Sequence, residues 1–310
     1  MNRRATGSLV LCLLCVAAPA AAAAADELDQ RIGAGQAVAS GRAVLSTGHV
    51  DVGPRFVGGS WTLMIHDDTA KADGARSVWR HTGQTVLRVG DEARMKAPDD
   101  PAYGFLAAAP GSEVFVVPQT QNPDVVWVGW NTQDPEVMET IDRGVTMTLT
   151  GVQGPGSLVV YLQSGDFAAP RVLWDSTSRA RPVWVDVNTH THATWVFSEA
   201  GVYLARVTVA ADLVDGSSVT DSRDLRFAVG TRTSADAAFA ATSSVAPGEA
   251  APAARQATPD GGDSDDSGPG GTWVALIAVA AAALAAALAA VLVRGNRAKQ
   301  RARSAGDAGA

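Results

Sequence analysis

Hydrophobic and polar residues alternate through most of the chain between residues 38 and 229. An apolar residue at every second position is typical of a strand with one buried face, and no segment here keeps a helical period over several turns. Candidate strands are 61–66, 85–89, 114–117, 125–130, 145–152, 157–163, 171–175, 183–187, 191–197, 202–211 and 219–229. Gly, Pro, Asp and Asn separate them, as expected for turns. The pattern therefore predicts an all-β fold.

The regular spacing of these short strands favours β-sandwich architecture. A Gly-rich turn at 151–156 suggests a division into an N-terminal β-domain over 26–150 and an immunoglobulin-like β-sandwich over 151–230. Large aromatic residues dominate the cores of small sandwiches, so we expect the aromatic residues of these segments to pack inside. They are Trp61, Trp127, Trp130, Trp174, Trp184, Trp195, Phe197 and Tyr203.

The first 25 residues resemble a secretory signal peptide. Arg3 and Arg4 precede an apolar run over 9–18, and small residues follow up to Ala25. Positive, apolar and small-residue regions in that order are the signature of a cleaved export signal. We therefore expect residues 1–25 to be removed and the rest of the chain to be exported.

A second apolar run, over 273–293, contains no charged residue and is long enough to cross a bilayer as one helix. The tail over 294–310 is basic and is expected to stay in the cytoplasm. An Ala, Pro, Ser, Gly and Asp-rich stretch over 231–272 has too few large apolar residues to form a core, which predicts a disordered stalk. These features predict a single-pass type I protein of the cell membrane with its ectodomain outside.

Composition excludes several kinds of chemistry. The two cysteines among the 310 residues, Cys12 and Cys15, both lie in the predicted signal peptide, so the mature chain has no disulfide or thiolate site. The formal charge of −7 disfavours nucleic acid as a partner, which would need a basic surface. No G-x-S-x-G, Walker or H-E-x-x-H motif is present, and we expect no enzymatic activity.

Two of the five histidines form the most informative motif, His190-Thr191-His192. In a strand whose Trp195 and Phe197 face the core, both histidines point to the opposite face with Cβ atoms roughly 6–7 Å apart. Imidazole is a common ligand of divalent zinc, copper, nickel and iron. The motif is therefore a candidate metal site, although two solvated histidines would give the same pattern.

A second group of possible ligands lies near the N-terminal end of the strand-rich region. His49 and Asp51 share one face of a predicted short strand, and His66 points away from the core at the end of another. Zinc needs three or four nitrogen or oxygen ligands in tetrahedral geometry, and manganese, the second choice, prefers more carboxylate oxygen. The predicted metal ligands are therefore His190, His192, His49, Asp51 and His66.

The same motifs resemble a known family. The segments 48–51, 127–132 and 154–156, and above all 190–197 followed by Gly201-Val202-Tyr203, are similar to the actinobacterial surface-anchored repeat family, also called choice-of-anchor M proteins. The resemblance spans about residues 44–229, and Thr194 departs from it where many members carry Asn. It implies exported β-domain proteins encoded near metal-type ABC transporters, and hence a link to metal uptake and to transporter components as partners.

Three functions stay open from the sequence. The first is a non-enzymatic surface protein that binds Zn²⁺, or Mn²⁺ as second choice, for an ABC importer. The second is a structural or adhesive cell-surface module with no metal site, since sandwich domains commonly serve recognition. The third is a metallohydrolase, which would need an open coordination position beside a general base.

Overall fold

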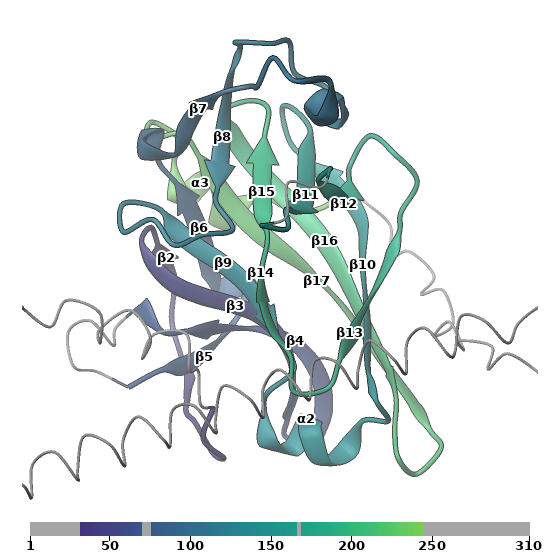
Figure 1. The fold of residues 1–310 in the computed structure, drawn as a ribbon. Coiled ribbons are helices and arrows are strands. Elements are labelled where there is room, and N and C mark those ends of the chain that lie inside the picture. Colours follow the sequence, from purple (N-terminus) through teal and green to yellow (C-terminus); the bar gives the residue numbers. More distant parts are fainter. Residues whose placement is uncertain (1–31, 70–75, 166–168, 245–310) are drawn as a thin grey trace, which may run out of the picture. The chain divides into compact units, whose positions relative to one another are not determined.

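A computed structural model describes residues 32–69, 76–165 and 169–244 (Figure 1). These residues form three sheets and a few short helices, which confirms the mostly β prediction. The predicted signal peptide (1–25), membrane span (273–293) and cytoplasmic tail (294–310) lie outside this range. Among the residues that are described, no helix is long and apolar enough to cross a membrane.

The first sheet contains six strands in the order β1-β5-β4-β3-β9-β14. They are β1 (Val38–Ala39), β3 (Gly48–Val57), β4 (Ser60–Asp67), β5 (Val78–His81), β9 (Val126–Asn131) and β14 (His190–His192). The long β3 pairs antiparallel with β4 on one side and parallel with β9 on the other. The short β14 closes the sheet by antiparallel pairing with β9. Residues far apart in the sequence, near 50, 129 and 191, therefore lie on adjacent strands.

The second sheet has the order β13-β10-β16-β17-β6-β2 and the third the order β12-β11-β15-β8-β7. The second sheet is formed by β2 (Ala43–Leu45), β6 (Thr85–Val89), β10 (Gly144–Gln153), β13 (Pro182–Asp186), β16 (Gly201–Asp212) and β17 (Ser218–Val229). The third is formed by β7 (Arg94–Lys96), β8 (Glu113–Val117), β11 (Leu158–Leu162), β12 (Arg171–Asp175) and β15 (Thr194–Phe197). The short helices are η2 (Thr82–Gln84), η3 (Asp91–Ala93), η4 (Pro101–Leu106), α2 (Pro135–Thr140) and α3 (Ala235–Ala240).

All three sheets contribute one face to a shared hydrophobic core. Alternate residues of each strand enter it, for example Val50 and Val52 of β3 and Trp195 and Phe197 of β15. The domain boundary predicted between residues 150 and 151 falls inside β10, and the core takes residues from both sides of it. The two predicted β-domains therefore share one core. Trp184 is 41% exposed, so the prediction that it packs inside is wrong.

The strand predicted over 191–197 is divided between two sheets. Its first part, β14, pairs with β9 of the first sheet, and its second part, β15, pairs with β8 and β11 of the third. Buried Ala193 lies between the two parts. Because the alternation continues through Ala193, His190 and His192 both face away from the core that Trp195 enters.

The predicted stalk begins later than its composition indicated. Residues 231–244 are ordered, and Ser234 caps α3 by accepting a hydrogen bond from the backbone N–H of Ala237. Ala238 of this helix is fully buried against Val86 and Ala228, which lie outside the main core. This apolar contact holds the segment on the second sheet, so the prediction of disorder is wrong for 231–244. Residues 245–272 lie outside the described range.

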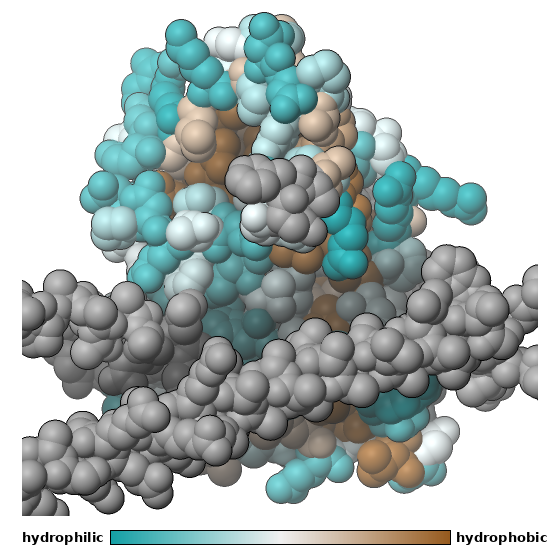
Figure 2. Space-filling view, viewed as in Figure 1, coloured by the Kyte–Doolittle hydropathy of each residue, from teal (hydrophilic) through white to brown (hydrophobic). Residues whose placement is uncertain are grey.

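The outer face of the third sheet carries a separate, smaller apolar cluster. It consists of Ala97, Leu106, Val114, Val159, Tyr161 and Val196, with η4 packed beside it. Figure 2 shows hydrophobic side chains in a recess on this face, bordered by hydrophilic ones. By alternation, Val196 of this cluster points to the same outward side of the chain as His190 and His192 of β14.

Candidate metal centre

Four of the five predicted ligands meet on the outward face of the first sheet. His49 and Asp51 alternate along β3 with Val50 and Val52, which enter the core, and so point the other way. His190 and His192 come from β14 and point to the same side. One ligand atom from each of these four residues lies within 4.8 Å of all the others. The four side chains therefore converge, which the sequence alone left open.

Strand register explains why these side chains meet. Asp51 lies opposite Gly129 of β9 in the parallel pairing, and His192 lies opposite the same glycine in the antiparallel pairing. Asp51, Gly129 and His192 thus form one row across three strands. Because glycine has no side chain, the carboxylate and the imidazole reach toward each other over the middle strand. His49 and His190 flank this row on either side.

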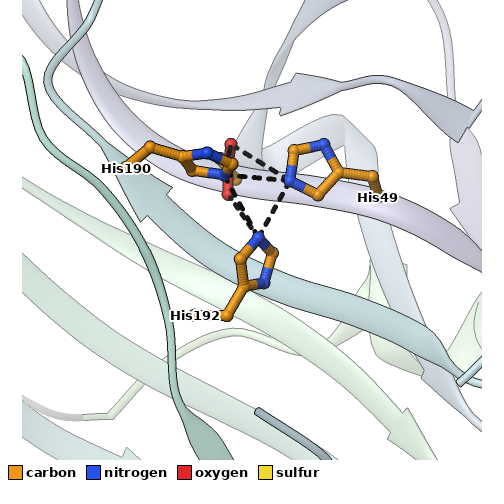
Figure 3. Close-up of side chains that lie close together, drawn as sticks. His49, His190 and His192 are labelled. Carbon is orange, nitrogen blue, oxygen red and sulfur yellow. Dashed lines mark hydrogen bonds and ion pairs between the residues drawn. The ribbon is translucent and has the colours of Figure 1, made fainter. Parts of the chain in front are cut away.

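The three imidazoles present the same nitrogen, Nε2, to a common point (Figure 3). His49 Nε2 lies 2.9 Å from His192 Nε2 and 3.0 Å from His190 Nε2, and the last two are 3.2 Å apart. The Asp51 carboxylate completes the group, with Oδ2 at 3.1 Å from His190 Nε2 and 3.5 Å from His49 Nε2. Its Oδ1 lies 3.6 Å from His192 Nε2.

These separations fit a tetrahedral metal site. Zinc bonds to imidazole nitrogen and carboxylate oxygen near 2.0–2.2 Å, which places tetrahedral ligands about 3.3–3.5 Å apart. In the structure the three nitrogen–nitrogen separations run from 2.9 to 3.2 Å, and each nitrogen has one of the two Asp51 oxygens at 3.1 to 3.6 Å. The four residues are therefore spaced closely enough for one ion to reach the three nitrogens and a carboxylate oxygen.

Hydrogen bonding alone does not account for three converging nitrogens. The Nε2 of a neutral imidazole is either a donor or an acceptor, so two of any three must have the same role. At least one of the three short nitrogen–nitrogen separations must then join two donors or two acceptors. A cation at the centre removes the conflict, because all three lone pairs can bind it.

Asp51 supplies a buried negative charge at this point. Burial alone would raise the pKa of its carboxyl, but the hydrogen bond with His190 and the electrostatic attraction of the His49, His190 and His192 imidazoles lower the pKa to about 2. Its partners among the described residues are Asn131, whose Nδ2 donates to Oδ2 at 3.2 Å, and the three histidines. Oδ1 is buried and has no hydrogen-bond partner there. A buried carboxylate with an unused oxygen is a suitable metal ligand.

His192 is held as a neutral imidazole against an aromatic ring. Burial lowers the pKa of His192 to about 3, although the charge of Asp51 opposes this shift. Its ring stacks on Trp127, with the ring centroids 3.7 Å apart and the planes 13° from parallel. Trp127 is itself fixed, since its Nε1 donates to the carbonyl of Gln119 at 3.0 Å. A neutral, immobilised imidazole is ready to donate its lone pair to a metal.

His66, the fifth predicted ligand, is not one of these four residues. It is fully buried on β4, packed edge-on against Trp79, and its Nε2 donates to Gln36 Oε1 at 2.8 Å. Its Nδ1 lies 3.6 Å from Asp68, whose other carboxylate oxygen lies 3.0 Å from His49 Nδ1. The structure thus places His66 behind the group, with Asp68 between it and His49.

Three residues of β9 shape the site without having been predicted to do so. Val126, Val128 and Trp130 of this strand enter the core. Trp127, Gly129 and Asn131 alternate with them and face outward. Trp127 is buried, as predicted, but it lies outside the main core and stacks on His192. A tryptophan, a glycine and an asparagine on the outward face of a central strand were the available signal.

Comparisons of the chain with family models, curated proteins and solved structures found no match. The family resemblance therefore stays a prediction. The candidate metal centre is identified from its donor atoms, their separations and the burial of Asp51.

Proposed function

We propose that the protein is a membrane-tethered extracellular protein that captures a divalent metal ion, zinc first, for uptake by an ABC transporter. The observation that carries this proposal is the meeting of three Nε2 atoms and one buried carboxylate within 4.8 Å. A set of three imidazoles and one carboxylate suits zinc better than manganese, which prefers oxygen ligands. Zn²⁺ is therefore the proposed ligand and Mn²⁺ the second choice.

The ligand set favours binding over catalysis. Catalytic zinc sites use three protein ligands and keep the fourth position for water or substrate, whereas closed sites use four. His49, His190, His192 and Asp51 together supply four. The side chains of His49 and His190 are 11% and 12% exposed, which leaves a path for the ion to enter and leave. A closed but accessible site is what a protein that takes up and releases a metal requires.

The location and partner in this proposal rest on the sequence. The export signal at 1–25 and the apolar run at 273–293 would place the site outside the membrane and tether it there. The resemblance to choice-of-anchor M proteins supports a metal-type ABC transporter as the partner. Tethering would keep the binding protein close to an importer in the same membrane.

Growth under zinc limitation tests this function. In the source organism, deletion of the coding sequence should slow growth in chelator-treated medium, and added zinc or the wild-type protein should restore it. The chain carrying both His190→Ala and His192→Ala should not restore growth, because two of the four ligands are gone. Restoration by this variant to the wild-type level, at equal protein abundance, would refute the proposed role.

A further inference from the structure

We propose that Asp68 is the positioning residue of the metal centre and acts by holding His49 in its ligating orientation. The inference rests on the proposed metal-binding function and adds to it a residue that does not itself belong to the ligand group. It follows from the contacts between Asp68 and His49 and from the buried residues behind Asp68.

Asp68 contacts His49 through both its side chain and its backbone. Its carboxylate Oδ2 accepts a hydrogen bond from His49 Nδ1 at 3.0 Å, and its backbone N–H donates to the carbonyl of His49 at 3.1 Å. The β3–β4 pairing ends beside these two residues, with Val50 opposite Asp67. The Asp68 side chain is only 3% exposed. Two bonds between one pair of residues fix the position of the His49 ring as well as its rotation.

The side-chain bond also decides which nitrogen of His49 can bind a metal. A carboxylate accepts hydrogen bonds and, when ionised, donates none, so the proton of His49 belongs on Nδ1. The lone pair of Nε2 then points to His190 and His192, whose Nε2 atoms lie at 3.0 and 2.9 Å. Metal-bound histidines generally donate their other ring N–H to a carboxylate or carbonyl, which orients the ring and increases its basicity.

His66 lies on the other side of Asp68 from His49, and Gln36 holds the far side of the His66 ring. His66 is fully buried, its Nδ1 lies 3.6 Å from Asp68 Oδ1, and its Nε2 donates to Gln36 Oε1 at 2.8 Å. Asp68 thus lies between two histidines, of which only His49 belongs to the ligand group.

Zinc affinity of the full-length chain, measured by competition with a chelating dye, tests the proposal. Asp68→Ala should bind zinc about 10–100-fold more weakly than wild type, the usual cost of losing such a hydrogen-bond partner. Asp68→Asn keeps the shape and an acceptor oxygen, so its affinity should fall between the two. The matched control is Asp67→Asn, because Asp67 is equally buried but bonds Thr69 and Arg80 instead of a ligand. Asp67→Asn should bind zinc like wild type.

A second readout follows the His49 ring in metal-free protein. Imidazole ¹⁵N chemical shifts should show the proton on His49 Nδ1 in wild type and a mixture of tautomers in Asp68→Ala. A variant that only lost fold stability would not change this ratio. If wild type binds zinc and Asp68→Ala and Asp68→Asn bind it equally well, the role of Asp68 is wrong while metal binding stands. If wild type binds no zinc, the proposed function itself is wrong.

Discussion

The chain carrying His190→Ala and His192→Ala should lose tight zinc binding, with an affinity at least about 1,000-fold below that of wild type. Loss of a single hydrogen-bond partner behind a ligand already costs 10–100-fold, and here two direct ligands disappear. The remaining donors, His49 and Asp51, cannot form a four-coordinate site. Isothermal titration calorimetry of the full-length chain, with a competing chelator for the wild type, measures the difference.

A histidine outside the centre serves as the control for this variant. His81 lies at the end of β5 and does not belong to the ligand group, so His81→Ala should bind zinc like wild type. Circular dichroism should show the β-rich spectrum in all three chains, because the substituted side chains lie outside the main core. Equal zinc affinity in the double variant and wild type would show that these histidines do not bind the metal.

Gly129→Ala should also weaken zinc binding strongly, by about 100-fold or more, although it removes no ligand. A Cβ at this position would lie 2.5 Å from Asp51 Oδ1, 2.7 Å from the carbonyl of Thr191 and 2.8 Å from His192 Cε1. Such separations are too short for non-bonded atoms, so Asp51 and His192 would have to move apart. Two of the four ligand positions would then be lost from a geometry that tolerates shifts of only about 0.5 Å. Dye competition and calorimetry measure the effect.

Gly144→Ala is the matched control for crowding. A Cβ there would lie 2.3 Å from the carbonyl of Val185 and 2.9 Å from Trp184, but it would not touch a ligand. Both glycine variants should lose stability, in the range of 1–3 kcal/mol typical of overpacking, whereas only Gly129→Ala should lose zinc affinity. Equal zinc affinity in the two variants would mean that the row over Gly129 is not part of the site.

Most of the longer strands could be predicted because each buries one face. The segments predicted over 85–89 and 171–175 agree with β6 and β12, and those over 202–211 and 219–229 fall within β16 and β17. The short β1, β2, β5 and β7 were not predicted, since two to four residues give too little alternation to recognise. The passage of one strand from the first sheet to the third depends on tertiary pairing, which alternation does not record.

The side chains of the candidate centre were predictable because alternation fixed the outward side of His49, Asp51, His190 and His192. Their convergence was not, because it depends on the pairing of β3 and β14 with the same strand, β9. His66 points to the same side of the sheet as these four side chains, but β4 lies on the far side of β3 from β9. That order of strands leaves His66 outside the group of four, and sequence pattern alone does not give it.

X-ray absorption at the zinc edge of the zinc-loaded full-length chain shows whether His49, His190, His192 and Asp51 bind one metal ion together. We expect one zinc per chain, bound by three imidazole nitrogens and at least one carboxylate oxygen at about 2.0–2.2 Å. The three-imidazole signal should disappear in the variant with both His190→Ala and His192→Ala. A wild-type spectrum of hydrated zinc, or of zinc with fewer than three imidazoles, would contradict the assignment of this centre.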